Sequence, residues 1–205
     1  MLYPIHNAGL LVLAAGQSKR LGRPKQLLEF EGQSLLNRLL GILKKSSNHP
    51  IGLVLGANAL LIEQQLTETN IHVIVNPDWE EGMASSIRLG VQEMTQHLPG
   101  LDGLMILVCD QPHITENQIK SLFQLQQEKD LPLAASYYSG VVGTPVLFHR
   151  SIFADLLSLK GDIGAKSVIQ QREKEVARLD FEKGMIDIDK PEDYEQLISG
   201  DSNDY

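Results

Sequence analysis

The sequence predicts an α/β fold in which helices cover both faces of a mostly parallel sheet. Short apolar runs alternate with amphipathic segments of helical length. The runs Leu10–Ala14 and Gly103–Val108 are apolar from end to end, which is typical of strands buried on both faces. This rhythm favours parallel pairing, because parallel neighbours need a long crossover between them. The length of 205 residues suits one domain with a substantial core.

Each expected element follows from its hydrophobic pattern and its end signals. Leucines recur on one side of the first predicted helix, and a later helix opens with the capping-box pattern Thr115–Gln118. Residues 1–198 form one domain in this interpretation, and the polar segment 199–205 is expected to be a disordered tail. Strands are expected at Leu10–Ala14, Gly52–Leu55, His72–Val75, Gly103–Val108, Ala134–Tyr138, Pro145–Phe148, Val176–Leu179 and Met185–Ile188, with a turn at Ser139–Gly143. Helices are expected at Ser34–Lys45, Leu60–Leu66, Met83–Thr95, Thr115–Lys129, Ile152–Leu157, Gly164–Gln171 and after Pro191.

The composition argues against several classes of protein. The net charge of −8 disfavours broad nucleic-acid binding. Cys109 is the only cysteine, so an intrachain disulfide and a Cys-rich zinc site are both excluded. No apolar run is long enough to span a bilayer, and residues 1–7 lack the pattern of a signal peptide. We therefore expect a cytoplasmic protein without nucleic-acid or membrane partners.

The loop after the first strand carries the strongest chemical signal. Leu10–Ala14 runs into Gly16, and the cations Lys19, Arg20, Arg23 and Lys25 follow. A buried strand that ends in a glycine-containing basic loop is a common way for α/β proteins to hold phosphates. The loop matches neither the P-loop nor the dinucleotide fingerprint. Taken alone, it fits a strand-to-helix turn with solvated charges equally well.

Two further segments are expected at the same rim, because ligands of parallel sheets bind beyond the carboxyl ends of the strands. Asn76 follows the third predicted strand, and Asp110 follows the fully apolar Gly103–Val108 strand. A carboxylate there can hold Mg²⁺, which takes one or two carboxylates plus phosphate oxygens and water. Capping the next helix is the alternative role for Asp110, but Thr115 already suits that cap. Lys25 alone is an ordinary surface lysine, and its case rests on its neighbours in the basic loop.

Several other polar residues have two interpretations each. Ser85 and Ser86 begin a helix, where they either contact a nucleotide or only cap the helix. Asp162 is either a ligand of the site or the N-cap of the next helix. The spacing of Asp189 and Glu192 is that of a capping box, so capping is the favoured role of Asp189. A second metal ligand at Asp187 or Asp189 stays open, and Trp79 either packs its loop or edges the site.

Nucleophilic hydrolase chemistry has little support in the sequence. The six histidines show no paired metal-ligand spacing, and no G-x-S-x-G elbow is present. Cys109 lies at the end of an expected buried strand.

Together these segments resemble the MobA-like nucleotidyltransferases, most closely the molybdenum cofactor cytidylyltransferase branch. The stretch Leu13–Lys25 is similar to the signature L-A-A-G-x-S-x-R-M-G-x-x-K, with Leu21 in place of methionine. The resemblance extends over nearly the whole chain. Further similar segments, in the expected order, are Asn76 with Glu81–Ser86, Asp110–Pro112, Gly143–Phe148, Gly161–Lys166 and Asp187–Asp193.

The resemblance implies a single-domain, Rossmann-like three-layer sandwich of the nucleotide-diphospho-sugar transferase type. It also implies Mg²⁺, a nucleoside triphosphate, and attack of an acceptor phosphate on the α-phosphorus with release of pyrophosphate. The Leu-Ala-Ala-Gly form is similar to the cytidine-using branch, so CTP is the favoured nucleotide. By this analogy Arg20, Lys25 and Asp110 are catalytic, and Asp110 and Asp189 bind the metal. The nucleotide-binding residues would be Leu13, Ala14, Ala15, Gly16, Lys25, Asn76, Gly82 and Ser85.

The acceptor is expected to be molybdopterin or molybdenum cofactor, with one departure from the family pattern. Thr144 stands where relatives often carry histidine between glycine and proline. The alternatives are therefore another nucleotide, or a sugar or polyol phosphate acceptor. A third hypothesis is a non-catalytic cofactor carrier or insertion factor, whose partner would be a molybdoenzyme or its chaperone.

Overall fold

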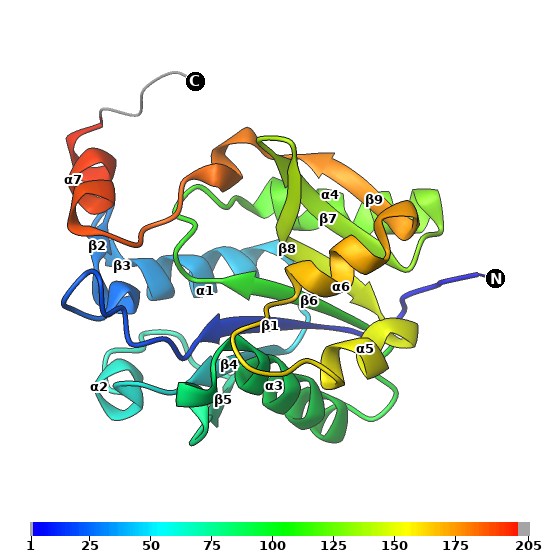
Figure 1. The fold of residues 1–205 in the computed structure, drawn as a ribbon, viewed down its shortest axis with the longest axis horizontal. Coiled ribbons are helices and arrows are strands. Elements are labelled where there is room, and N and C mark those ends of the chain that lie inside the picture. The colour runs from blue at the N-terminus through cyan, green and yellow to red at the C-terminus, as the bar shows by residue number, and fades with distance from the viewer. Residues whose placement is uncertain (1, 201–205) are drawn as a thin grey trace.

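A computed structural model describes residues 2–200 and contains one seven-stranded sheet (Figure 1). Its strand order is β5-β4-β1-β6-β8-β7-β9, and β8 is antiparallel to both of its neighbours, β6 and β7. All other pairings in this sheet are parallel. The strands are β1 Ala8–Ala14, β4 Ile51–Leu55, β5 Ile71–Val75, β6 Gly103–Val108, β7 Leu133–Tyr138, β8 Val141–His149 and β9 Val176–Asp180. A separate hairpin pairs β2 Glu29–Phe30 with β3 Gln33–Ser34.

Helices cover both faces of the sheet, which gives three layers. One buried cluster joins α1 and α4 to the sheet, and a second joins α3, α5 and α6 to its other face. In β6, Leu104 and Ile106 belong to one cluster, while Met105 and Leu107 belong to the other, as the alternation of a strand requires. The helices are α1 Leu35–Ser46, α2 Ala59–Glu63, α3 Met83–His97, α4 Glu116–Lys129, α5 Phe153–Leu157, α6 Lys166–Gln171 and α7 Pro191–Ser199.

The predicted α/β class is confirmed, and most predicted elements occur within a few residues of their expected bounds. The predicted cap at Thr115 is confirmed, because its hydroxyl accepts a hydrogen bond from the N–H of Gln118. Ser34, expected inside the first helix, is its N-cap and accepts from the N–H of Asn37. The reciprocal half of the capping box is absent, since the Gln118 side chain reaches Ser136 on β7 instead. Within residues 2–200, no helix is long and apolar enough to cross a membrane.

The second half of the chain contains the main differences from the prediction. Met185–Ile188 is not a strand: a 3-10 turn spans Glu182–Met185, and the following residues are irregular. The apolar Ile188 in this segment packs in a small cluster away from the sheet, so its hydrophobicity does not indicate a strand. The turn before β8 is short, because Val141–Gly143 already pair with β7. Helix α2 ends at Glu63, three residues earlier than predicted. The predicted tail was 199–205, and its residues 201–205 lie outside the described part of the chain.

The last helix is anchored beside the basic loop rather than against the main sheet. Leu21 of the loop, Ile188 and Leu197 of α7 share one buried cluster. The Tyr194 hydroxyl also donates to the carbonyl of Glu29 in β2, at 2.9 Å. Figure 1 shows α7 beside the β2–β3 hairpin, at the edge of the molecule opposite the N-terminal segment. The segment before α7 thereby reaches the loop after β1 and the end of β6, because Asp189 contacts Lys25 and the N–H of Ile188 donates to the carbonyl of Asp110.

The burial of β6 generates a stability prediction. The Leu107 side chain is fully buried, so Leu107→Ala removes apolar contacts and leaves a cavity. We expect it to lower the free energy of unfolding by about 2–5 kcal/mol, as measured by urea denaturation. The matched control is Leu60→Ala on α2, where the side chain is 77% exposed and the expected change is within about 0.5 kcal/mol. Equal losses in the two variants would contradict this description of the core.

Candidate functional site

A cavity of about 620 Å³ lies at the carboxyl ends of β1 and β6, with the basic loop on one side. The start of α3 and the segment before α7 complete it. Two of the three predicted rim segments, the basic loop after β1 and Asp110 after β6, therefore meet there as expected, whereas Asn76 does not line the cavity. Sequence-predicted residues in its wall are Leu13, Ala14, Ala15, Gly16, Arg20, Lys25, Gly82, Asp110 and Asp189, together with Trp79 and Asp162, which sequence reasoning left ambiguous.

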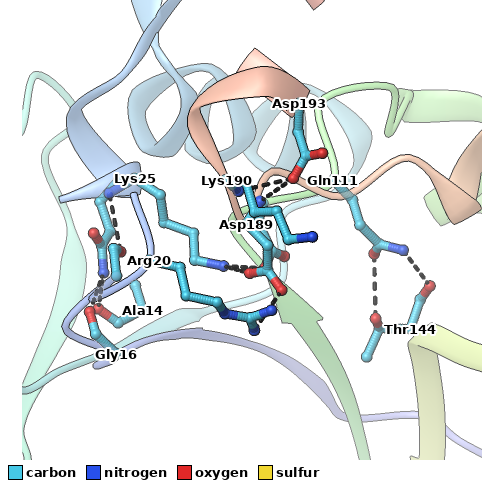
Figure 2. A network of polar contacts seen from close by, with 12 residues as sticks. Ala14, Gly16, Arg20, Lys25, Gln111, Thr144, Asp189, Lys190 and Asp193 are labelled. Atoms are coloured by element: carbon cyan, nitrogen blue, oxygen red, sulfur yellow. Dashed lines mark hydrogen bonds and ion pairs between the residues drawn. The ribbon is translucent and has the colours of Figure 1, made fainter. Parts of the chain in front are cut away.

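Lys25 is the centre of the polar network in this cavity. Its ammonium lies 2.6 Å from Asp110 Oδ2 and 2.8 Å from Asp189 Oδ1. The second oxygen of Asp189 contacts Arg20 at 3.0 Å, so the two cations converge on one carboxylate (Figure 2). Lys25 and Asp110 are mostly buried, with side chains 16% and 19% exposed, whereas Arg20 is largely exposed. The network thus extends from the protein interior to the mouth of the cavity.

The charges of this network shift the pKa values of its members in different directions. Burial disfavours the Lys25 ammonium, but the charge of Asp110 and hydrogen bonds to both carboxylates outweigh it and raise the pKa of Lys25. The hydrogen bond from Lys25 lowers the pKa of Asp189. Burial, followed by repulsion from Asp110 and Asp189, raises the pKa of Asp187. Lys25 is therefore a permanently charged cation at any physiological pH.

Asp110 has one oxygen available for a further ligand. Its Oδ2 contacts Lys25, but its Oδ1 is buried without a hydrogen-bond partner in the described structure. Its backbone carbonyl accepts from the N–H of Ile188, which ties the segment before α7 to the end of β6. Both oxygens of Asp189, in contrast, already face cations. Among residues 2–200 no three His, Cys, Asp or Glu side chains group into a metal site, so a cation here would need ligand oxygens from elsewhere.

Gln26 is a buried residue of the site that the sequence analysis did not select. It is 1% exposed, and its amide nitrogen donates to the carbonyls of Ala14 at 2.7 Å and Gly16 at 3.1 Å. Next to it, the N–H of Lys25 donates to Ser18 Oγ at 3.1 Å. The short helical turn after Pro24 therefore fastens the basic loop at several points. In the sequence, Gln26 is a single glutamine between a lysine and two leucines, and nothing distinguishes it from an ordinary polar residue of a helix.

The structure separates two predicted nucleotide contacts from the cavity wall. Asn76 is 2% exposed, and its amide nitrogen donates to the hydroxyls of Ser85 at 2.9 Å and Ser86 at 3.0 Å. Ser85 in turn donates to the carbonyls of Asp78 and Gly82. Neither Asn76 nor Ser85 lines the cavity, whereas Ser86 does. Asn76 and Ser85 therefore hold the start of α3 in place.

Gly82 combines a special backbone with a close approach between two loops. Its φ is +117°, and a Cβ there would lie 2.7 Å from the carbonyl oxygen of Gly161. The N–H of Ala84 donates to that same carbonyl. Only glycine allows the start of α3 to contact the 161–162 loop so closely.

An ion pair beside this contact fastens the two loops further. Arg88 contacts Glu81 at 2.6 Å and donates to the carbonyl of Leu159. The hydrogen bond from Arg88, helped by the N–H of Gly161, lowers the pKa of the Glu81 carboxyl to about 2. The wall of the cavity formed by these loops is therefore held in place by charge-assisted bonds.

A second cavity of about 400 Å³ adjoins the first and shares Leu13, Met83, Val108 and Asp110 with it. Its polar wall includes Gln111, Thr144, Lys166 and Asp187. Gln111 donates to the backbone carbonyl of Thr144 at 3.2 Å and accepts from the Thr144 hydroxyl (Figure 2). It also donates to the carbonyl of Gly184 at 2.7 Å. Asp110 thus stands between two spaces, one beside the basic loop and one beside β8.

The capping role favoured for Asp189 is wrong, and of the two alternatives for Asp162 the structure rules out the cap. The N-cap of α7 is Lys190, and the carboxylate of Asp193 accepts from the N–H groups of Asp189 and Lys190 (Figure 2). The Asp189 side chain is therefore free to face Lys25 and Arg20. Asp162 does not cap α6 either, because that helix begins at Lys166 with Ala165 before it, and Asp162 lines the first cavity instead.

The fold and this site define a class of nucleotide-transferring α/β proteins, and the comparisons agree. The family model described as the MobA-like NTP transferase domain matches residues 10–176. The chain therefore belongs to the MobA-like NTP transferase family, which confirms the resemblance that the sequence motifs indicated. The fold is the Rossmann-like three-layer sandwich of the nucleotide-diphospho-sugar transferase type.

Curated relatives of similar length carry different names. Nicotine blue oxidoreductase of Paenarthrobacter nicotinovorans is 28% identical, over 79% of this chain and 81% of its own. Purine catabolism protein PucB of Bacillus subtilis is 27% identical, over 90% and 93%. Molybdenum cofactor cytidylyltransferase of Escherichia coli is 24% identical, over 90% and 92%. The family is thus shared by proteins whose names point to different substrates and different reactions.

Solved structures show the same fold. Rv0371c from Mycobacterium tuberculosis H37Rv superposes with a TM-score of 0.84 at 27% identity, covering 96% of this chain and 99% of that one. A nucleotidyl transferase from Methanothermobacter thermautotroptrophicus reaches 0.78 at 17% identity, covering 95% and 97%.

The pairing of Lys25 with two carboxylates generates a pH prediction. Because the pKa of Asp189 is lowered in the folded protein, its contribution to stability is present above the ordinary carboxyl pKa and is lost as the pH falls through the lowered value. Lys25→Met leaves Asp110 without its cation and Asp189 with Arg20 alone. We expect it to be less stable than the wild type near pH 7, with the difference shrinking below about pH 4.

Urea denaturation across the acidic range measures this difference. The control is Lys45→Met, because Lys45 is exposed on α1 and should show a small difference from the wild type at every pH. A Lys25→Met penalty that stays constant down to about pH 3 would show that the carboxylate pairing does not stabilise the fold.

Proposed function

We propose that this protein transfers a CMP group from CTP to the phosphate of molybdopterin or molybdenum cofactor and releases pyrophosphate. The observation that carries the proposal is the position of Lys25. It ends the basic loop in the wall of the first cavity and lies between Asp189 and Asp110, and Asp110 lines both cavities. A donor in the first cavity and an acceptor in the second would place a reacting phosphorus near Asp110.

The chain's own residues supply binding, orientation and charge. Lys25 and Arg20 would neutralise the negative charge that develops on the triphosphate as pyrophosphate leaves. The loop at Gly16 would hold the phosphates, and the walls from Leu13 to Ala15 and at Gly82 would bound the nucleoside. Nucleotidyl transfer depends mostly on positioning and electrostatics, so the site needs no protein nucleophile.

A divalent cation, Mg²⁺ in our proposal, fits the ligand atoms that are present. The unpartnered Oδ1 of Asp110 is a hard oxygen donor at the boundary of the two cavities. The remaining ligands would be phosphate oxygens and water, which Mg²⁺ commonly retains. When bound, the cation would polarise the phosphoryl group. Asp189 stays a proposed second ligand that would exchange a contact with Lys25 or Arg20 for one with the metal.

The acceptor is the least constrained part of the proposal. The molybdenum cofactor assignment rests on the motif resemblance and on the name of one relative. The second cavity has a polar wall of Gln111, Thr144 and Lys166, which suits a polar acceptor. Thr144 keeps a sugar or polyol phosphate as an alternative acceptor.

A substrate screen tests the proposal directly. The protein is incubated with Mg²⁺, each of the four nucleoside triphosphates and either molybdenum cofactor or a panel of sugar and polyol phosphates. We expect pyrophosphate release to be fastest with CTP and molybdenum cofactor. Turnover with another nucleotide or another acceptor would change the proposed substrates but keep the reaction. No turnover with any nucleotide and acceptor would contradict nucleotidyl transfer.

Two substitutions test the roles of the central residues. Lys25→Met and Asp110→Asn should each reduce kcat by about 10²–10³. The first removes a cation that would neutralise the reacting phosphate, and the second removes the carboxylate charge that would hold the divalent cation. Lys45→Met on α1 is the control and should retain full activity. If the purified protein still delivers cofactor to a molybdoenzyme with Asp110→Asn at undiminished rate, a carrier without metal-assisted chemistry is the better description.

A further inference from the structure

Gln26 holds the backbone of the basic loop through hydrogen bonds, and the role inferred for it below rests on the proposed nucleotide site. Gln26 is almost fully buried, and its amide nitrogen uses both hydrogens on backbone carbonyls, at Ala14 and Gly16. Between them, the carbonyl of Ala15 accepts from the N–H of Ala57 at 2.9 Å. Three successive carbonyls at the start of the loop are therefore all held by donors from elsewhere in the protein.

The orientation of these carbonyls fixes the orientation of the following N–H groups. In a trans peptide the C=O and the N–H point in opposite directions across one plane. Holding the carbonyls of Ala14 and Gly16 therefore also directs the N–H groups of Ala15 and Gln17. Among residues 2–200, the N–H groups of Ala15, Gly16 and Gln17 have no hydrogen-bond acceptor. All three residues line the first cavity.

Unpaired backbone N–H groups in a row are an anion-binding arrangement. If one of these peptide units rotated, its carbonyl oxygen would face the phosphate in place of its N–H. The attraction between N–H and phosphate would then become a repulsion between two oxygens. The Gln26 side chain prevents this rotation at two peptides at once. It also lies one residue after Lys25, so the same short turn positions both the backbone donors and the central cation.

We propose that Gln26 is a positioning residue that orients the backbone N–H groups of Ala15 and Gln17 toward the phosphates of the bound nucleotide. The amide nitrogen is the group that matters, because the Gln26 Oε1 is buried without a partner in the described residues. Gln26 does not touch the substrate in this proposal. Its effect on nucleotide binding passes through the loop.

The experiment measures binding of CTP and of cytidine to the wild type, Gln26→Met and Gln26→Glu. Trp79 is the only tryptophan and lines the cavity, so its fluorescence reports binding. Methionine keeps the length and loses the donor, whereas glutamate places oxygen atoms against the two carbonyls. Two lost hydrogen bonds should weaken CTP binding by about tenfold to a hundredfold and leave cytidine binding within about twofold. Inorganic tripolyphosphate should lose affinity in parallel with CTP.

A pH profile separates positioning from simple loss of structure. A protonated carboxyl can donate one hydrogen bond, so Gln26→Glu should recover part of its CTP affinity as the pH falls, and Gln26→Met should not. Gln127→Met, on the exposed side of α4, is the matched control and should bind CTP like the wild type. Thermal unfolding confirms that each variant is folded.

The possible outcomes are distinct. A folded Gln26→Met that binds CTP like the wild type, or that loses CTP and cytidine equally, would overturn the positioning role. A wild type that binds neither CTP nor tripolyphosphate would instead overturn the proposed function, whatever the variants do.

Discussion

The placement of one lysine ammonium between two carboxylates organises this molecule. Lys25 comes from the loop after β1, Asp110 from the end of β6, and Asp189 from the segment before α7, so their contacts join three parts of the chain far apart in sequence. Burial alone would disfavour the charge on Lys25, and the two carboxylates make it stable. The same contacts hold Arg20 at the mouth of the cavity through Asp189. An anionic ligand would meet two cations whose positions are already set.

The fold supplies the frame that makes these contacts possible. Parallel strands β1 and β6 are neighbours, so the loops at their carboxyl ends meet at one edge. The antiparallel strand β8 then brings Thr144 beside Gln111, immediately after Asp110, and creates the second cavity. The cluster of Leu21, Ile188 and Leu197 holds α7 and the segment before it over the basic loop. Each cavity is thus bounded by elements whose positions are fixed by buried apolar contacts elsewhere.

Much of the polar structure around the site serves to hold loops rather than to contact a ligand. Asn76 is an example. Its predicted ligand role rested on its place after the third strand, whereas its amide nitrogen donates hydrogen bonds to the hydroxyls of Ser85 and Ser86. Gly82, Glu81 and Arg88 fasten the start of α3 to the 159–162 loop. Gln26 does the same for the basic loop. Buried side chains of this kind shape the site through the backbone segments that they hold in place.

The sequence by itself determined the α/β class, the positions of most strands and helices, and the rim that carries Gly16, Lys25 and Asp110. These features follow from local hydrophobic periodicity and from chain order, which are properties of neighbouring residues. Only the tertiary structure decided the partners of the polar side chains. Asp189 has the spacing of a cap but faces Lys25, because Asp193 takes the capping role. The segment 185–188 has the pattern of a strand, yet Ile188 packs against α7 and the loop. The roles of Gln26, Asn76 and Asp189 depend on atoms that approach from distant parts of the chain, and no local pattern encodes such an approach.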